Sequence, residues 1–171
     1  MNIQVARPAT RDDLDELCRL YRLLEAEMVA LHPMWPLADG LPEPIELALG
    51  DALDDPDSVV VVGGIDGSLF GFLLARVEDL LPQAGGERLG SIRLVFVEPE
   101  AREVGIGEHM RDLALESLRG RGITKFDAHV LPGHRVVKNF FEAGGFSARS
   151  IVMHRDDRNP DRGRRPTPDL R

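Results

Sequence analysis

Two apolar runs joined by an Asp-Gly pair constrain the fold more than any other feature of this sequence. Residues 58–65 and 69–77 are rich in Val, Leu and Phe, and a short turn containing Asp66-Gly67 separates them. An Asp-Gly pair between two such runs is the strongest local signal for a β-hairpin. A third apolar run, 89–97, follows turn residues at 82–87. We therefore expect an antiparallel meander of three strands.

Helices and further strands are predicted on both sides of the meander. Apolar residues spaced three and four apart predict a helix from Leu14 to Leu31, with Thr10 as its N-cap and Asp13 in a variant capping box. The other predicted elements are a strand at 3–6, a loop at 32–44, helices at 45–53, 105–119 and 133–143, and strands at 125–130 and 146–154. This order predicts an α/β domain over residues 1–155, followed by a polar, flexible tail at 156–171.

Composition excludes several classes of protein. A chain of 171 residues favours a single domain, and its longest apolar stretches are far shorter than the ~20 residues of a spanning helix. The first nine residues show no signal-peptide pattern, so we expect a soluble, cytoplasmic protein. Cys18 is the only cysteine, which excludes an internal disulfide and a Cys-rich zinc site, and we expect a buried thiol and no metal.

Charge is divided unevenly along the chain. Residues 1–98 carry a net charge of −11, whereas residues 99–155 carry +2, in a chain whose total is −8. No dominant basic region exists, so a nucleic-acid partner is not expected. The division suggests an anionic ligand on the C-terminal half and a cationic one on the N-terminal half. The competing interpretation is that acidic loops only keep the protein soluble.

A strand, a short loop and a glycine-containing helix start follow one another at residues 95–107. The strand ends before Pro99, and Gly105 and Gly107 stand where the next helix begins. Backbone amides at a helix N-terminus lack acceptors within the helix and favour a negative charge, so this segment predicts a diphosphate cradle with Arg102 as a cation at its rim. Met110 replaces the third glycine of a dinucleotide fingerprint, and no Gly-Lys-Ser/Thr sequence of a P-loop occurs.

This segment and its surroundings resemble the GNAT superfamily of N-acetyltransferases. Residues 102–107 match Arg/Gln-x-x-Gly-x-Gly, Arg7-Pro8-Ala9-Thr10 precedes the first helix, and Phe141-Glu142-Ala143-Gly144-Gly145-Phe146 stands where the family has Tyr-x-x-x-Gly-Phe. The resemblance covers nearly all of residues 1–155. It implies a mixed, mostly antiparallel sheet of six or seven strands flanked by helices, and it favours a homodimer.

The resemblance also implies acetyl-CoA as a co-substrate, held between the strands 89–97 and 125–130. The pantetheine arm would be contacted by backbone groups of Val95, Phe96 and Val97. The cradle would enclose the pyrophosphate with Arg102, Glu103, Val104, Gly105, Ile106, Gly107 and Glu108. The family often has an asparagine at the position of His134, a place that Asn139 can take instead.

Catalytic positions depart from the family pattern. Phe141 stands where many members have a tyrosine that acts as a general acid, and it either packs against pantetheine or belongs to the core. Ser91 takes the position of the glutamate base of histone-type members, where it can only hold a water that relays a proton. His129, on the polar side of its strand, is a candidate base with a suitable pKa. The competing interpretation is a solvent-facing strand histidine, and Glu78 and Glu98 are further candidates.

The acceptor is predicted to be a primary amine, on a small molecule or a protein. Between Asp39 and Asp57 the chain has seven acidic residues and no basic one, which favours a cationic acceptor. Trp35 lies in the loop before this stretch, where it either lines the acceptor pocket or anchors the loop. Two alternatives stay open: a CoA-binding module without catalysis, and an interaction protein with a degenerate loop.

Overall fold

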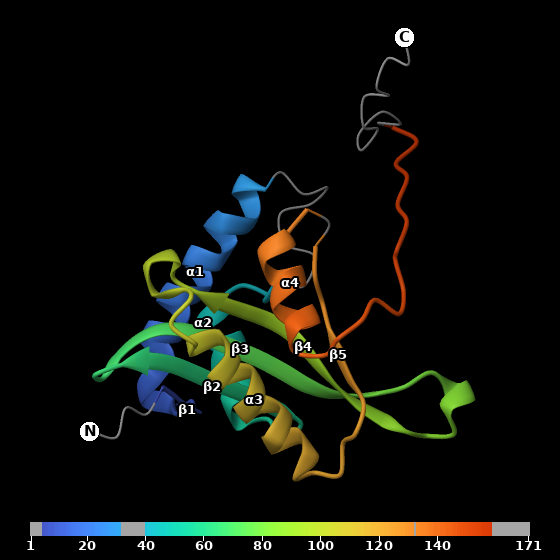
Figure 1. Cartoon of the computed structure of the whole chain (residues 1–171), viewed down its shortest axis with the longest axis horizontal. Coiled ribbons are helices and arrows are strands. Elements are labelled where there is room, and N and C mark those ends of the chain that lie inside the picture. The colour runs from blue at the N-terminus through green and yellow to red at the C-terminus, as the bar shows by residue number, and fades with distance from the viewer. Residues whose placement is uncertain (1–4, 32–39, 132, 159–171) are drawn as a thin grey trace.

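Five strands form one sheet in the order β1-β2-β3-β4-β5 (Figure 1). The computed structural model describes residues 5–31, 40–131 and 133–158. The first four strands pair antiparallel, and β5 pairs parallel with β4. The strands are β1 (Ala6–Pro8), β2 (Ser58–Ile65), β3 (Ser68–Asp79), β4 (Arg88–Val97) and β5 (Phe126–Ala128).

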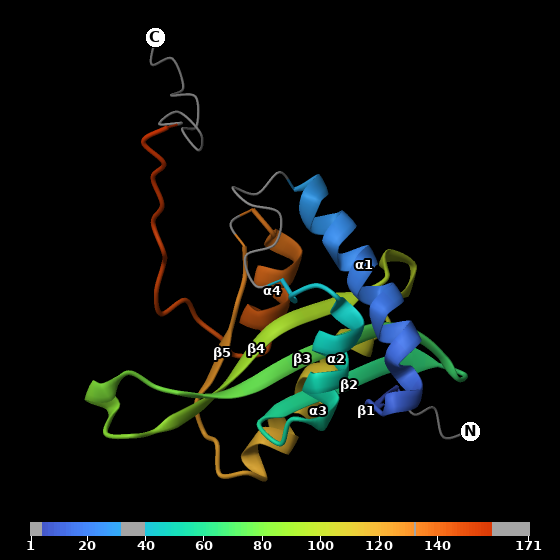
Figure 2. The ribbon, with the colours of Figure 1, turned by 180° about the vertical axis from the view of Figure 1, so that it is seen from behind.

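Helices cover both faces of the sheet. Two of them, α1 (Leu14–Ala30) and α2 (Ile45–Asp54), lie on the face seen in Figure 2, and α3 (Ile106–Arg119) and α4 (Arg135–Ala143) lie on the opposite face. Each face buries its own apolar cluster. The α1-side core centres on Leu17, Leu20, Leu49, Phe72 and Phe96. The α3-side core centres on Leu73, Ile92, Ile106, Met110 and Phe141.

The predicted hairpin turn and helix start are confirmed. Asp66 and Gly67 both have positive φ angles, 50° and 82°, as the two-residue turn between β2 and β3 requires. Thr10 is the N-cap of a 3-10 turn, Arg11–Asp13, that runs directly into α1, and the Thr10 amide donates to the Asp13 carboxylate at 2.8 Å. The same carboxylate accepts two bonds of 2.7 Å from Arg7 on β1, so the first strand is fastened to the helix that follows it.

Close contact between α3 and the sheet depends on glycine. A Cβ atom at Gly63 of β2 would lie 2.6 Å from the Ile106 side chain and 2.9 Å from that of Met110. Such a contact is too short for any real Cβ, so the missing side chain lets the N-terminal turn of α3 rest directly on the sheet. The loop that precedes α3 is positioned in this way.

The sheet differs from the prediction at its two edges. The expected six or seven strands are wrong for the described residues, because residues 146–154 form no strand. The last described part of the chain turns away from the sheet (Figure 1), and among the described residues no strand pairs beyond β5. The strand expected at 3–6 is found as Ala6–Pro8, and residues 3 and 4 lie outside the described residues. Pro8 is tolerated in this strand because β1 lies at the edge of the sheet. Residues 32–39 of the predicted loop also lie outside the described residues.

Candidate functional site

Strands β4 and β5 separate shortly after they meet. Their parallel pairing covers only Gly90–Ile92 against Phe126–Ala128. The His129 amide still donates to the Ile92 carbonyl at 3.1 Å, but β4 continues to Val97 with no strand on that side. The result is an opening at the carboxyl ends of two parallel strands, where ligands typically bind in sheets of this kind.

Backbone groups of β4 line this opening. The Glu98 amide donates to the Phe70 carbonyl of β3 at 2.8 Å, and backbone groups of alternate residues point to the same neighbouring strand. Val95 and Val97 therefore direct their amides and carbonyls away from β3, toward the open side. The Val97 carbonyl accepts a bond of 2.8 Å from Arg102 Nε, so one of these groups already has a protein partner.

A one-residue bulge at Arg93 marks the point of separation. Leu94 faces Leu74 and Ile92 faces Ala75, which makes Arg93 the extra residue of β4. The bulge reverses the alternation of side chains along β4. Ile92 consequently belongs to the α3-side core, whereas Leu94 belongs to the α1-side core. Strict alternation along residues 89–97 predicts that Ser91, Arg93, Val95 and Val97 share one face, and the bulge makes this prediction wrong.

Three titratable side chains meet beside the bulge. Arg93 Nη1 lies 3.1 Å from His129 Nε2 and 3.4 Å from Glu78 Oε1. A guanidinium only donates hydrogen bonds, so this contact is a hydrogen bond in the tautomer that carries its proton on Nδ1 and leaves Nε2 as the acceptor. His129 is exposed, at the position where β5 leaves β4. Of the two predicted catalytic residues, it is the one that lies at the opening.

Ser91 lies deeper in the sheet. It pairs with Arg76 on one side and Asp127 on the other, within the closed part of the β4–β5 ladder. Its side chain is completely buried, and among the described residues its hydroxyl has no hydrogen-bond partner. Since buried hydroxyls almost always have a partner, Ser91 Oγ is suited to hold a water molecule rather than to contact an acceptor directly.

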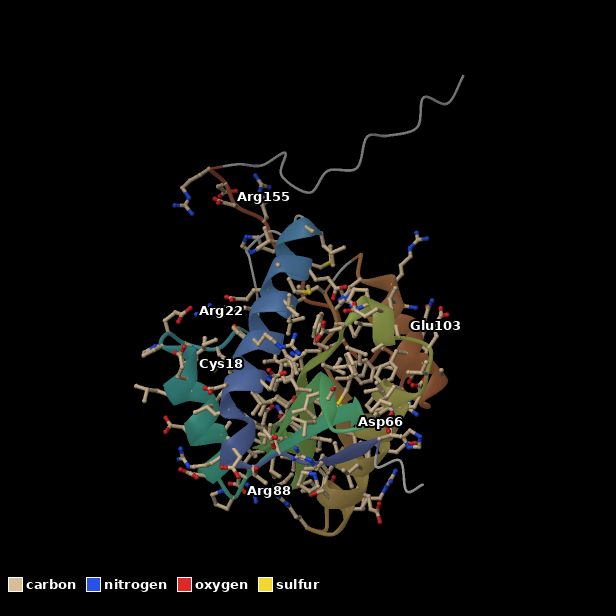
Figure 3. The ribbon with its side chains drawn as sticks, turned by 90° about the vertical axis from the view of Figure 1, so that its left-hand side faces the viewer. Cys18, Arg22, Asp66, Arg88, Glu103 and Arg155 are labelled. Carbon is tan, nitrogen blue, oxygen red and sulfur yellow. The ribbon has the colours of Figure 1, made fainter. Side chains whose placement is uncertain are left out.

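The loop before α3 has the geometry of an anion cradle. Glu103 and Gly105 both have positive φ angles, 69° and 88°, and Figure 3 labels Glu103 at the exposed rim of the loop. The first hydrogen bond of the helix runs from the His109 amide to the Gly105 carbonyl. The amides of Ile106, Gly107 and Glu108 come before it, so they have no acceptor within the helix. Together with the dipole of α3 they favour an anion.

The two glycines of the cradle are required for different structural reasons. Gly105 is needed for its conformation, because its φ angle of 88° disfavours other residues. Space is not the reason, since a Cβ there would meet only His109, at 3.7 Å. Gly107 is needed for packing, because a Cβ there would lie 3.1 Å from the ring of Phe140 on α4. Phe140 in turn lies 5.0 Å from the Arg111 guanidinium. The cradle is thus held between α3 and α4.

Arg102 reaches from the cradle to α1. Its Nη2 bonds to Glu27 Oε1 at 2.6 Å, and its guanidinium lies 5.8 Å from the centre of the Phe96 ring. The charge of Glu27 also acts on His134, the N-cap of α4. Burial, and to a lesser degree Arg102, lower the pKa of His134, while Glu27 opposes them. This cluster of Glu27, Arg102 and His134 joins α1, the cradle and α4.

The remaining predicted site residues lie on or beside α3 and α4. Asn139 is exposed on α4, and Val104 and Glu108 are exposed on the cradle. Phe141 is buried in the α3-side core, with its ring 5.0 Å from that of Phe140 and 5.2 Å from that of Phe146. Its described contacts are therefore those of a core residue. Trp35 and Asp39, named above for the acceptor, lie outside the described residues.

The whole arrangement is that of a known family. The family model of the acetyltransferase (GNAT) family matches residues 17–146. The chain belongs to this family. Since the match runs from α1 through the last glycines after α4, it includes both strands of the opening and the complete cradle. A search of curated protein sequences finds no significant match.

Solved structures share the GNAT fold at low sequence identity. A protein from Bacillus halodurans has a TM-score of 0.75 and 18% identity over 88% of this chain and 98% of that one. AAC(6′)-Iy, in complex with the bisubstrate analogue CoA-S-monomethyl-acetylneamine, has a TM-score of 0.71 and 18% identity over 91% and 99% of the two chains. A ribosomal-protein-alanine N-acetyltransferase from Brucella melitensis has a TM-score of 0.63 and 17% identity over 87% and 98%.

Two observations bear on metals and membranes. Among the described residues, no group of three or more His, Cys, Asp and Glu side chains is placed to hold a metal ion. In the same part of the chain, no helix has the length and apolar character needed to cross a membrane.

Sequence reasoning missed Glu27 as a site residue and the contact between Arg93 and His129. Glu27 occupies one turn of an amphipathic helix, and no motif distinguishes it from the other acidic residues of α1. Arg93 interrupts the apolar run 89–97, and this is the one signal by which the bulge could have been found.

Proposed function

We propose that this protein is an acetyl-CoA-dependent N-acetyltransferase that acts on a primary amine. The observation that supports this proposal best is the pairing of an amide-lined cradle with a strand opening directly beside it. Membership of the GNAT family makes acetyl-CoA the expected acyl donor. Its thioester would lie in the opening between β4 and β5, and its pyrophosphate at the amides of residues 103–108.

In this proposal, the chain holds the cofactor mainly with backbone groups. The Val95 amide and carbonyl and the Val97 amide face the opening, where they can pair with the amides of the pantetheine arm. Arg102 contributes in one of two ways. It stays bound to Glu27 and positions the end of β4, or it turns outward to the phosphates.

Proton removal is assigned to His129. Its neutral imidazole has a lone pair on Nε2, which Arg93 occupies in the structure. Arg93 also reaches Glu78, so a shift of the guanidinium toward that carboxylate frees Nε2 to accept a proton from the attacking amine. Ser91, buried on the adjacent strand, is assigned a bound water that relays the proton when the amine is not in direct contact with His129.

No tyrosine is available as a general acid at the usual position. Phe141 stands there and is buried among aromatic rings. We propose that the CoA thiolate leaves without protonation by the protein, because a thiol pKa of ~8.5 makes it a tolerable leaving group near neutral pH. General acid catalysis is typically worth ~10²–10⁴-fold, so the turnover number should be modest.

A cationic amine is the favoured acceptor. The N-terminal part of the chain, up to Glu98, carries the net negative charge. Several of its acidic residues are paired internally, Glu43 with Arg22 and Asp57 with Arg88 among them, which reduces the attraction. The names of two similar structures refer to aminoglycoside and ribosomal-protein alanine acceptors, so both small-molecule and protein amines belong in the test.

Two experiments test this function. Calorimetric titration with acetyl-CoA, CoA and a dephosphorylated analogue should show binding that depends on the phosphates. Release of free thiol with a panel of polyamines, aminoglycosides and peptides should then identify an acceptor. Binding without thiol release from any amine would favour the alternative of a non-catalytic CoA-binding module, and absence of binding would favour an interaction protein.

His129→Gln separates the catalytic step from binding. We expect thiol release to fall by about 100-fold, as for loss of a general base, while acetyl-CoA affinity stays unchanged. Lys138→Gln, an exposed change on α4 that removes an ion pair with Glu142, is the control and should leave both unchanged. Unaltered turnover in His129→Gln would remove this residue from the mechanism.

A further inference from the structure

The face of the sheet on which α1 and α2 pack becomes polar where β4 and β5 separate. Charged or titratable side chains of β3 and β5 point to this face, because their chain neighbours pack into the α3-side core. They are Arg76 and Glu78 on β3 and Asp127 and His129 on β5. Arg76 and His129 are exposed, and Figure 2 shows the β3–β4 hairpin extending beyond both helices. A ligand can therefore reach this face beside the opening.

Arg93 joins this group by its contacts. Its Nη1 lies 3.1 Å from His129 Nε2 and 3.4 Å from Glu78 Oε1. Hydrogen bonds between a guanidinium and a carboxylate are usually about 2.7–2.9 Å long, so the contact with Glu78 is loose. The pair of Arg102 and Glu27, at 2.6 Å, is a tight one in the same site. Arg93 thus occupies the lone pair of the proposed base, while Glu78 holds it only weakly.

Removal of Arg93 from Nε2 needs a stronger partner than Glu78. The same nitrogen, Nη1, contacts both side chains, so Glu78 alone leaves His129 covered. A carboxylate on the acceptor is such a partner, because a guanidinium presents its donors in a planar fork that matches the two carboxylate oxygens. A cationic group at the same place on the acceptor would be repelled by Arg93.

The distance between these two side chains restricts where the carboxylate lies on the acceptor. Nη1 and Nε2 are only 3.1 Å apart. A carboxylate on Arg93 and an amine on Nε2 must therefore be close neighbours within one molecule. They are close neighbours when both are attached to the same carbon atom, which is the arrangement of an α-amino acid.

We propose that the acceptor is a free α-amino acid, and that its carboxylate draws Arg93 away from His129. Nε2 then accepts the proton that the amine loses as the new C–N bond forms, while the C–S bond of the thioester breaks and the thiolate leaves. An amine without a carboxylate leaves Arg93 on Nε2 and reacts slowly. The ammonium group of an amino acid keeps the attraction to the acidic N-terminal part of the chain. This inference rests on the proposed function and names the substrate class of the same site.

Thiol release with matched acceptors tests the inference. Each L-amino acid is compared with the primary amine that lacks its carboxylate, and we expect kcat/KM to be about 10- to 150-fold higher for the amino acid, as one hydrogen bond between charged groups predicts. Arg93→Ala should lower kcat/KM for the amino acid and raise it for the amine, because Nε2 is no longer covered. Arg88→Ala, a half-exposed arginine on the same strand, is the matched control and should keep the natural preference.

Opposite changes for the two acceptors are a result that a merely structural role of Arg93 would not give. Equal losses for both acceptors in Arg93→Ala would overturn the inference. A natural chain that prefers the amine without a carboxylate would do the same. In both cases thiol release is still observed, so the proposed function would stand.

NMR of the imidazole nitrogens tests carboxylate binding without turnover. The probes are an N-acetyl amino acid and its uncharged amide, added without acetyl-CoA, and His129→Gln assigns the resonance. We expect His129 Nε2 to shift with the N-acetyl amino acid, but not with the amide and not in Arg93→Ala. Absence of this shift in the natural chain would overturn the inference. A shift without thiol release from any amine would support the carboxylate site and refute the proposed function, so the two failures are distinguishable.

Discussion

The conformation of Gly105 can be tested separately from its location in the cradle. Its φ angle is 88°, and a Cβ would meet nothing closer than 3.7 Å, so alanine introduces backbone strain without a steric clash. The left-handed conformation costs an alanine about 1–2 kcal/mol. For a chain of 171 residues, about 1 kcal/mol lowers the melting temperature by about 2–4 °C.

Gly122 provides a matched control for this change. It has a φ angle of 82°, a Cβ added there would meet nothing within 4 Å, and it lies beyond the opposite end of α3. A helix of 14 residues spans about 21 Å, so Gly122 is far from the cradle. Gly105→Ala and Gly122→Ala should therefore lower the melting temperature by similar amounts.

Only Gly105→Ala should weaken acetyl-CoA binding. Relaxation of its φ angle turns the neighbouring amides away from the pyrophosphate, and one hydrogen bond to a charged group is worth about 1.5–3 kcal/mol. This corresponds to a loss of affinity of about 10- to 150-fold, which isothermal titration calorimetry can measure. Equal affinities for the two variants, with equal loss of stability, would show that the conformation of this loop does not create the phosphate site.

Three further predictions concern the framework of the site. Arg102→Ala removes a cation that lowers the pKa of His134 and leaves Glu27 to act on it, so NMR titration should show a higher His134 pKa. Asp13→Asn removes a carboxylate whose pKa the Arg7 hydrogen bonds lower, and urea unfolding at pH 7 should show a loss of about 1–2 kcal/mol. The difference from the natural chain should shrink as the pH falls below the ordinary Asp pKa of ~3.9, and it should vanish only below the lowered pKa of the folded state. Phe72→Ala, at a fully buried position, should cost about 3–5 kcal/mol by the same assay, whereas Leu47→Ala should have little effect.

Local signals predicted most of the fold. The Asp66-Gly67 turn, the periodicity of α1 and the glycines before α3 each act within a few residues, and the structure confirms all three elements. The cradle was predictable for the same reason, because the conformation of Gly105 is a local property. The steric reason for Gly107 was not, since Phe140 approaches it from a helix that lies more than thirty residues away in sequence.

Long-range contacts account for what the sequence did not predict. Glu27 becomes a site residue only because α1 crosses the sheet near the cradle. Ser91 and Arg93 were placed on one face with Val95 and Val97 by strict alternation, and the bulge at Arg93 invalidates that rule. The strand expected at 146–154 has the composition of a strand, but composition does not predict whether the segment pairs with an edge of the sheet.

The Arg93 bulge has a consequence for how this fold tolerates change. Deletion of Arg93 would make Leu94 the direct neighbour of Ile92 and restore regular alternation in β4, and the side chains from Leu94 to Val97 would keep their present faces of the sheet. The same deletion would remove the guanidinium that contacts both His129 and Glu78 beside the strand opening. Both cores should therefore tolerate a deletion at the bulge, whereas a deletion within the regular stretch from Leu94 to Val97 would move the side chains beyond it to the other face of the sheet.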